Sequence, residues 1–205
     1  MDMNTKEFKQ TAKKIWNFLW KDESIWSWIV SLVLAFLLVK FIFFPGLSLL
    51  LGTSMPLVVV ESSSMHHSGS FLGNILGLQD DFEIWWQEKG SWYLEQGISK
   101  LEAEKWPLRT GFEMGDIILV TKSKNLEIGD IIIFEANQKH PLIHRIVEIK
   151  NENNELVYET KGDNNSGQLT IEKSITRDKI IGKAQFKIPK LGWVKLGFVK
   201  LFQGF

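Results

Sequence analysis

The chain has 205 residues and a formal net charge of zero, because 24 lysines and arginines balance 24 aspartates and glutamates. This balance, and the lack of a basic patch interleaved with aromatic residues, argue against a nucleic-acid-binding protein. The chain contains no cysteine, which excludes a disulfide framework, a thiolate nucleophile and a cysteine-based zinc site. The length suits one folded domain beside an anchoring segment.

The most apolar part of the chain runs from residue 25 to residue 51 and contains one charged residue, Lys40. A helix needs about 20 apolar residues to cross a bilayer. The segment therefore predicts a transmembrane anchor over 25–51, with a helix from Ile25 to about Phe44 that Pro45 and Gly46 end. A cleaved signal peptide is the alternative, but the run is long for one and no small-x-small cleavage site follows it.

Lysines just before the span predict its orientation. They are Lys6, Lys9, Lys13, Lys14 and Lys21. Positive flanks stay in the cytoplasm, so residues 1–24 are expected inside and the chain after about Leu51 outside the membrane. Residues 5–20 also have lysines and apolar residues at helical spacing. They predict either an amphipathic helix on the inner surface or a simple extension of the anchor.

Residues 52–190 predict an extracytoplasmic, mainly β domain. Short runs rich in Val and Ile alternate with turn signals. We expect strands over 56–60, 116–121, 130–135, 142–150, 155–161 and 179–188. Closely spaced strands without long helices are typical of a β-sandwich or β-barrel.

Two segments of this region differ from the rest. Residues 66–112 form an insertion with scattered tryptophans and helical stretches near 80–89 and 99–104. It either docks on the bilayer, shapes a cleft or forms a packed cap. The apolar C-terminal segment, 191–205, is too short to span a membrane, so it either lies in the interface or packs on the domain.

A nucleophilic hydrolase without cysteine needs a serine or threonine and a base. The four histidines are His66, His67, His140 and His144. His144 lies in an apolar strand. If the turn at 151–154 pairs Lys150 with Glu155, His144 faces Lys161, and Asp163 shares their side of the sheet. The alternative is that residues 162–165 form a plain turn.

Several motifs resemble those of type I signal peptidases, in the family's order. Ser62-Ser63-Ser64-Met65 is similar to their S-x-S-M box, and the runs that begin at Gly115 and Gly129 resemble the two strands that follow. Ile143-His144-Arg145-Ile146-Val147 matches the box in which archaeal and endoplasmic-reticulum members carry histidine and bacterial members lysine. The run Thr160 to Asn165 (TKGDNN) and the runs at 181–183 and 188–192 match the last boxes. Together they cover most of residues 56–193.

The resemblance implies a membrane-bound serine endopeptidase that removes signal peptides after small residues from exported preproteins. It implies Ser64 as the nucleophile, His144 as the general base and Asp163 as the acid that supports His144. The Ser64 amide and the Ser62 hydroxyl would stabilise the oxyanion. No metal or cofactor is implied.

Two departures from the family pattern leave alternatives open. His66 and His67 replace the region where many relatives have a proline, and either is an alternative base. Leu169 stands where relatives of this branch carry a second aspartate, so Glu172 or Asp178 are alternatives to Asp163 as the acid.

The expected partners are preproteins, the lipid bilayer of the cell membrane and the translocation machinery. Two other classes of function compete with the protease. One is a catalytically inactive, membrane-anchored β module that binds a translocation partner. The other is a metal site built from the four histidines, which no H-E-x-x-H motif supports.

Overall fold

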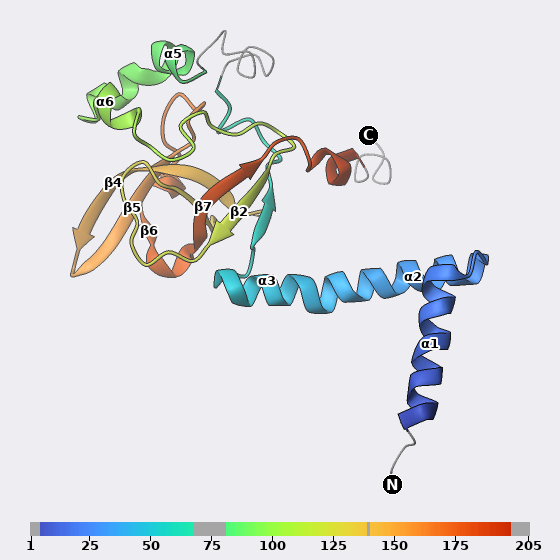
Figure 1. The fold of residues 1–205 in the computed structure, drawn as a ribbon. Helices are drawn as coiled ribbons and strands as arrows, with labels where there is room; N and C mark the ends of the chain where they lie inside the picture. The colour runs from blue at the N-terminus through green and yellow to red at the C-terminus, as the bar shows by residue number, and fades with distance from the viewer. Residues whose placement is uncertain (1–4, 68–80, 139, 198–205) are drawn as a thin grey trace. The chain divides into compact units, whose positions relative to one another are not determined.

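The computed structural model describes residues 5–67, 81–138 and 140–197. The chain divides into two compact units, 1–50 and 51–205, and each is described by itself (Figure 1).

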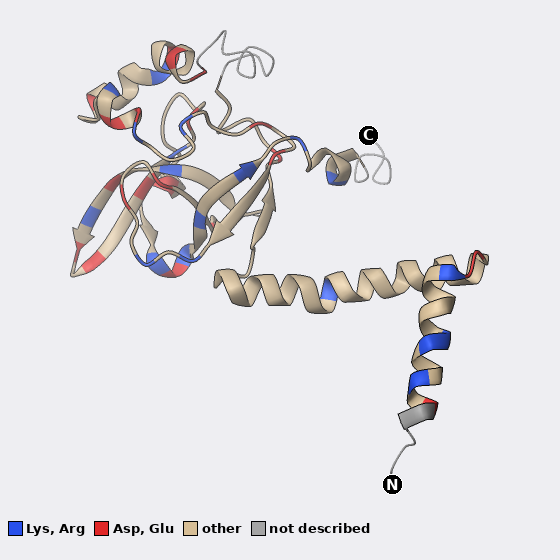
Figure 2. Ribbon diagram, in the orientation of Figure 1, with Lys and Arg blue, Asp and Glu red and all other residues tan. Residues whose placement is uncertain are grey.

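The first unit consists of helices. Helix α1 covers Thr5–Lys21, and a second helical run contains α2 (Ile25–Leu38), a π-helical turn η1 (Val39–Phe43) and α3 (Phe44–Leu51). From Ile25 to Leu51 this run is long and apolar enough to cross a membrane. In Figure 2 it carries a single basic band, from Lys40, whereas basic bands recur along α1.

The predicted end of the anchor helix at Pro45-Gly46 is wrong, because α3 continues through both residues to Leu51. Proline lacks an N–H and its ring clashes with the carbonyl four residues earlier in a regular α-helix. Here the π turn directly precedes it, and the Phe44 N–H bonds to the Val39 carbonyl five residues back. The wider turn gives the proline ring room.

A serine-lined junction joins α1 to α2. Ser24 caps α2 by accepting a hydrogen bond from the Ser27 N–H at 3.2 Å. The Ser27 hydroxyl donates to the Phe18 carbonyl, and the Ser31 hydroxyl donates to the Leu19 carbonyl at 3.3 Å. These bonds satisfy carbonyls at the end of α1, which have no partner within their own helix.

The second unit is built on one curled, seven-stranded antiparallel sheet with the order β1-β2-β7-β3-β4-β5-β6 (Figure 1). Its strands are β1 (Leu57–Val59), β2 (Ile117–Thr121), β3 (Ile131–Phe134), β4 (Leu142–Glu152), β5 (Glu155–Lys161), β6 (Ile175–Thr176) and β7 (Ile180–Ile188). The predicted mainly β fold is confirmed. Helices α5 (Asp81–Glu95) and α6 (Lys100–Ala103) belong to the predicted insertion, of which residues 68–80 lie outside the described residues.

Alternation along the central strand β3 divides the core between the two sides of the sheet. Ile131 and Ile133 pack into one apolar cluster, whereas Ile132 and Phe134 pack into another. Because successive side chains of a strand point to opposite faces, a strand buried on both faces reads as an unbroken apolar run. A third cluster is aromatic and comes mostly from the insertion. Its members are Phe82, Trp85, Trp86, Tyr93, Ile98, Ala103, Trp106 and Val147.

The β4–β5 hairpin has a different register from the predicted one. Glu152 pairs with Glu155 across a two-residue turn, and a bulge after Ile146 then brings Arg145 opposite Lys161. The turn residues Asn153 and Asn154 have φ values of 52° and 66°, the left-handed conformation that a tight hairpin turn needs. The predicted pairing of His144 with Lys161 is therefore wrong, and the strand residue opposite Lys161 is Arg145.

The first residues of the C-terminal segment pack against the sheet domain. The Gly192 N–H donates to the Gly115 carbonyl at 2.8 Å. Gly115 has a φ of 87°, and a β-carbon there would lie 2.3 Å from the Trp193 ring, so only glycine fits this contact. Residues 198–205 of the segment lie outside the described residues.

Candidate active site

Ser64 lies in the turn that follows β1. Backbone hydrogen bonds hold this turn from two sides, because the Asn164 N–H donates to the Ser64 carbonyl and the Phe112 N–H donates to the Met65 carbonyl, both at 2.8 Å. The Met65 side chain is 1 % exposed and fills the core beneath. The turn is thus fixed while Ser64 itself is half-buried.

His144 on β4 faces Ser64. The distance from His144 Nε2 to Ser64 Oγ is 3.0 Å, which is hydrogen-bonding distance for a base and a nucleophile. The histidine is 2 % exposed, and its ring makes a T-shaped contact with the Phe134 ring, with the centroids 6.4 Å apart. Burial and this packing restrict the imidazole to one orientation.

Glu172 contacts the other nitrogen of the imidazole. Its Oε1 lies 2.5 Å from His144 Nδ1, and the carboxylate is fully buried. The Leu169 N–H donates to Oε2 at 2.5 Å, and the Thr160 hydroxyl donates to Oε1 at 3.4 Å. Glu172 ends the short 3₁₀ helix η2 (Thr170–Glu172), whose first turn it caps with the same carboxylate.

Asp163, the predicted acid, contacts a different set of side chains. Its carboxylate accepts hydrogen bonds from Arg145 (Nε to Oδ1, 3.0 Å; Nη2 to Oδ2, 2.7 Å), from His67 Nε2 at 2.8 Å and from the Tyr93 hydroxyl at 3.3 Å. The register of the hairpin explains this placement, since Arg145 and His144 point to opposite sides of β4. The structure brings Ser64, His144 and Glu172 together and places Asp163 with Arg145.

The electrostatics of the Asp163 group follow from its burial and charges. Burial opposes the ionisation of Asp163, but Arg145 and the hydrogen bonds from His67 and Arg145 outweigh it and hold the pKa of Asp163 well below its usual value. Burial also lowers the pKa of His67, although its bond to Asp163 partly offsets this. His67 is therefore a neutral donor to the carboxylate at neutral pH.

Lys161 is a second buried cation near the site. Burial lowers its pKa to about 8, and attraction to Asp163 opposes that shift. Its Nζ donates to the Gly162 carbonyl at 3.1 Å and lies over the Trp92 and Tyr93 rings, 5.1 and 4.8 Å from their centroids. The lysine thus ties the end of β5 to the aromatic cluster.

Gly162 lies next to both Ser64 and His144, and its lack of a side chain leaves room for the two residues to approach each other. A β-carbon at this position would lie 2.9 Å from both His144 Nε2 and the Ser64 carbonyl oxygen. Any larger residue would have to displace one of these groups.

The remaining predicted residues occupy other positions. Ser62 is exposed, and its Oγ lies 3.3 Å from Ser64 Oγ. His66 is half-buried and His140 exposed. Asp178 is exposed, and hydrogen bonds, the first from Thr176, lower its pKa.

The geometry does not support the histidine metal site. His67 and His144 belong to separate clusters, each with its own carboxylate. Among the described residues, no group of three or more His, Asp or Glu side chains is arranged to hold a metal ion.

The arrangement of Ser64, His144 and Glu172 is that of a catalytic triad. A carboxylate on Nδ1 keeps the proton there, so that Nε2 presents its lone pair to the serine hydroxyl. Sequence reasoning left Glu172 as an alternative acid. Its position depends on how residues 162–171 fold back, and a strand pattern does not give that path. The one local signal is the capping of η2, in which Glu172 bonds to the N–H three residues earlier.

Comparisons with known proteins identify the family. No model of a protein family matches the chain. The signal peptidase complex catalytic subunit SEC11 of Eremothecium gossypii is 30% identical over 136 residues, which cover 62% of this chain and 80% of the relative. SEC11 of Zygosaccharomyces rouxii is 32% identical over 98 residues, 43% of this chain and 59% of the relative.

A bacterial relative shares a shorter region. Signal peptidase I W of Bacillus subtilis is 41% identical over 58 residues, which cover 27% of this chain and 30% of the relative. These relatives carry the names of catalytic subunits and peptidases, which favours the predicted enzyme over the inactive binding module. The predicted family and enzyme class are confirmed: the chain belongs to the type I signal peptidase family of serine endopeptidases, and within it to the endoplasmic-reticulum type.

Proposed function

We propose that this peptidase removes signal peptides from exported preproteins with Ser64 as nucleophile, His144 as general base and Glu172 as the acid of the triad. The observation that carries the proposal is the alignment of three groups. Ser64 Oγ lies 3.0 Å from one nitrogen of His144, and the buried Glu172 lies 2.5 Å from the other. The names of the relatives supply the substrate class.

The first half of the reaction forms an acyl-enzyme. Ser64 Oγ attacks the scissile carbonyl carbon while its proton passes to His144 Nε2. Glu172 stabilises the imidazolium that results. His144 then gives the proton to the leaving amine, the C–N bond breaks, and the mature protein departs with its new N-terminus.

The second half repeats this proton transfer with water as the nucleophile. His144 takes a proton from the water, which attacks the Ser64 ester, and returns a proton to Ser64 Oγ as the signal peptide leaves. In both halves the oxyanion needs donors, and we assign the Ser64 N–H and the Ser62 hydroxyl to it. The Ser62 hydroxyl is 3.3 Å from Ser64 Oγ, close to where the substrate carbonyl must come.

The enzyme is a membrane protein with one candidate spanning helix, Ile25–Leu51. We place the catalytic domain outside the cytoplasm, because lysines precede the span. Twelve residues separate Leu51 from Ser64, so the nucleophile works near the membrane surface. The bilayer and the translocation machinery that delivers the preprotein are the partners that this location requires.

Helix α1 belongs on the cytoplasmic membrane surface in this arrangement. Its apolar side chains Phe8, Ile15 and Trp16 are 63, 55 and 60 % exposed. Helical spacing puts Lys13, which is also exposed, on the side of the helix away from Phe8 and Ile15. A helix with this division of residues lies in the interface, with its lysines among anionic headgroups.

Cleavage of a preprotein by the full chain in lipid–detergent micelles tests the function. The wild-type protein should release a mature product with a new N-terminus at one site, with or without a chelator. Ser64→Ala should abolish release, and Ser123→Ala is a matched control in a surface loop that should leave it intact. Cleavage by Ser64→Ala would refute the nucleophile. If the wild-type protein binds the preprotein but never cleaves it, the result would favour the alternative function, a catalytically inactive β module that binds a partner.

A further inference from the structure

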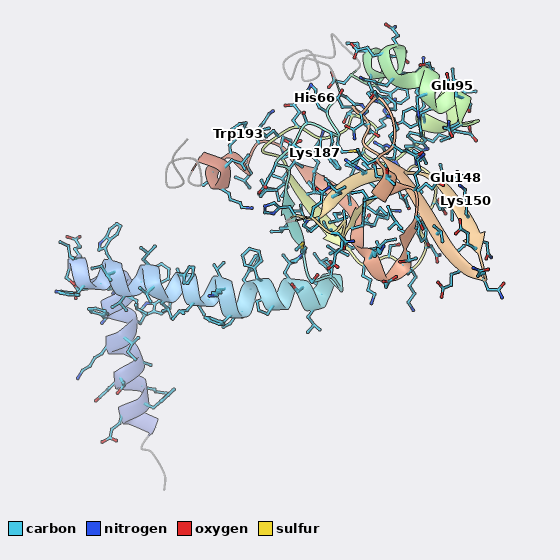
Figure 3. All side chains as sticks on the ribbon, turned by 180° about the vertical axis from the view of Figure 1, so that it is seen from behind. His66, Glu95, Glu148, Lys150, Lys187 and Trp193 are labelled. Carbon is cyan, nitrogen blue, oxygen red and sulfur yellow. The ribbon has the colours of Figure 1, made fainter. Side chains whose placement is uncertain are left out.

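Helix α5 of the insertion reaches the loop that adjoins the active site. The loop is Gly162–Asn165, between β5 and η2. Side chains fill the space between the insertion helices and the sheet in Figure 3. Those that carry hydrogen bonds to the loop are Trp85 and Tyr93. The insertion is therefore in direct contact with catalytic-domain residues that the family motif contains.

Trp85 and His67 hold Asp163 from two directions. The Trp85 indole N–H donates to the Asp163 carbonyl at 2.9 Å, while His67 Nε2 bonds to the carboxylate at 2.8 Å. The His67 and Trp85 rings are stacked, with centroids 4.4 Å apart and planes within 4° of parallel. The two side chains act as one clamp on the backbone and side chain of a single residue.

The clamp is fully buried, which makes its hydrogen bonds hard to replace. Trp85 is 1 % exposed, and the side chains of His67 and Asp163 are 0 % exposed. Water cannot take over a lost bond at such a site without rearrangement, so an unpaired carbonyl there is costly. Arg145, which is also fully buried, neutralises the carboxylate through an ion pair to Oδ2 at 2.7 Å.

The loop that contains Asp163 is also hydrogen-bonded to the turn that carries Ser64. The Asn164 N–H donates to the Ser64 carbonyl at 2.8 Å, and its side-chain amide donates to the Ser63 carbonyl at 3.1 Å. Gly162, on the other side of Asp163, lies against His144 Nε2. A shift of the Asp163 backbone would therefore move the turn that carries Ser64 relative to its base.

We propose that the insertion is a positioning device, in which Trp85 and His67 clamp Asp163 and so hold Ser64 in line with His144. This role rests on the proposed function for its effect on catalysis. Trp85 and His67 are positioning residues, since their hydrogen bonds go to Asp163 and not to Ser64 or His144. In this arrangement Asp163 supports catalysis by fixing the loop, and it does not need to contact His144.

A pair of adjacent tryptophans in α5 provides a matched test in the full chain. Trp85→Phe keeps an aromatic ring over His67 but removes the N–H that bonds to Asp163. Trp86→Phe makes the same change in the same aromatic cluster, in a residue whose indole is not the donor to Asp163. We expect Trp85→Phe to lower kcat by roughly tenfold to a hundredfold, the cost of small misplacements of reacting groups, with KM within about twofold. Trp86→Phe should keep kcat within about twofold.

A second measurement separates failure of the clamp from failure of the proposed function. Hydrogen exchange of the peptide that contains residues 162–165 reads the loop without any substrate. Exchange there should accelerate in Trp85→Phe and stay at the wild-type rate in Trp86→Phe, even if no preprotein is cleaved. Equal kcat and equal exchange in the two variants would overturn the proposal.

If Trp85→Phe does not fold, a third variant tests the same clamp. Tyr93→Phe removes only the 3.3 Å bond to Asp163, and it should raise the exchange and lower kcat to a smaller degree. Unchanged exchange and kcat in that variant would also overturn it.

Discussion

Two neighbouring residues of β4 point to opposite faces of the sheet and contact different groups of the site. His144 points to Ser64 and Glu172, while Arg145 points to Asp163. Each of the two side chains contacts one fully buried carboxylate, Glu172 for His144 and Asp163 for Arg145. In the mechanism that we propose, proton transfer uses only Glu172, and Asp163 has a positioning role.

Gly162 offers a direct test of the close contact between nucleophile and base. Gly162→Ala would put a β-carbon 2.9 Å from His144 Nε2 and from the Ser64 carbonyl. We expect kcat to fall by about two orders of magnitude, because one of the reacting groups must move. Gly167→Ala is the control, since a β-carbon there meets nothing within 4 Å. Comparable activity of the two variants would show that the contact is not tight.

The neutral His67 predicts a dependence of stability on pH. Its pKa in the folded chain lies below the ordinary value of 6.5, so below pH 6.5 the unfolded chain binds a proton that the folded chain does not. Stability is thus lost as the pH falls below 6.5, by at most about 1.4 kcal/mol per pH unit, and is unaffected by this group above it. Asp163 contributes in a separate window, below its ordinary value of 3.8.

His67→Gln removes this titration and leaves a side chain that can donate to Asp163. Thermal unfolding midpoints in detergent, measured from pH 7.5 to pH 5, should fall more steeply for the wild type than for the variant. Parallel curves would mean that His67 takes up its proton equally well in the folded chain.

At the scale of elements, residue patterns predicted the strands well and their pairing poorly. The apolar runs of β2 and β3 mark strands regardless of their neighbours, and β3 is buried along its whole length. Register depends on one turn and one bulge, and a shift of a single residue moves every side chain to the other face. That shift separates Asp163 from His144, so the triad acid could not be chosen from the hairpin pattern.

The anchor helix is a second feature that the sequence predicted only in part. Its length and apolar character were evident from composition, but the passage through Pro45 depends on the π turn before it. Glu172 is a third case, since its approach to His144 requires the whole path from Gly162 to η2. These three features depend on geometry that propensity does not encode.

The hairpin turn predicts a stabilising substitution. Asn153 and Asn154 both have positive φ, and the sequence that such a turn prefers is Asn-Gly. Asn154→Gly should raise the free energy of unfolding by about 0.5 kcal/mol, because glycine adopts this conformation without steric cost. Chemical denaturation of the detergent-solubilised chain measures the change. A decrease in stability would argue against the two-residue turn.

At the scale of the whole molecule, the chain joins a helical membrane unit to a mainly β catalytic unit. The first unit exposes most of its apolar side chains between residues 25 and 51, and the second has an apolar core made of three clusters. This division is what a protease needs if its substrate is itself a membrane-inserted helix followed by an extended cleavage site.

The absence of native cysteine makes the proposed orientation easy to test. Single cysteines at Gln10 and Lys124, both exposed, report on the two sides of the span. In intact cells, or in spheroplasts where a wall blocks the reagent, a membrane-impermeant maleimide should label Lys124→Cys but label Gln10→Cys only after permeabilisation. The reverse pattern would place the catalytic domain in the cytoplasm.

The triad with Glu172 as its acid is the central claim, and the turnover of Glu172→Gln on a saturating preprotein tests it most directly. The amide keeps the size of the side chain but cannot stabilise the imidazolium or hold its tautomer. The predicted result is a loss of about 10³- to 10⁴-fold in kcat, with an unchanged circular dichroism spectrum. A variant that turns over within about tenfold of the wild type would contradict the claim and return the role of the acid to Asp163.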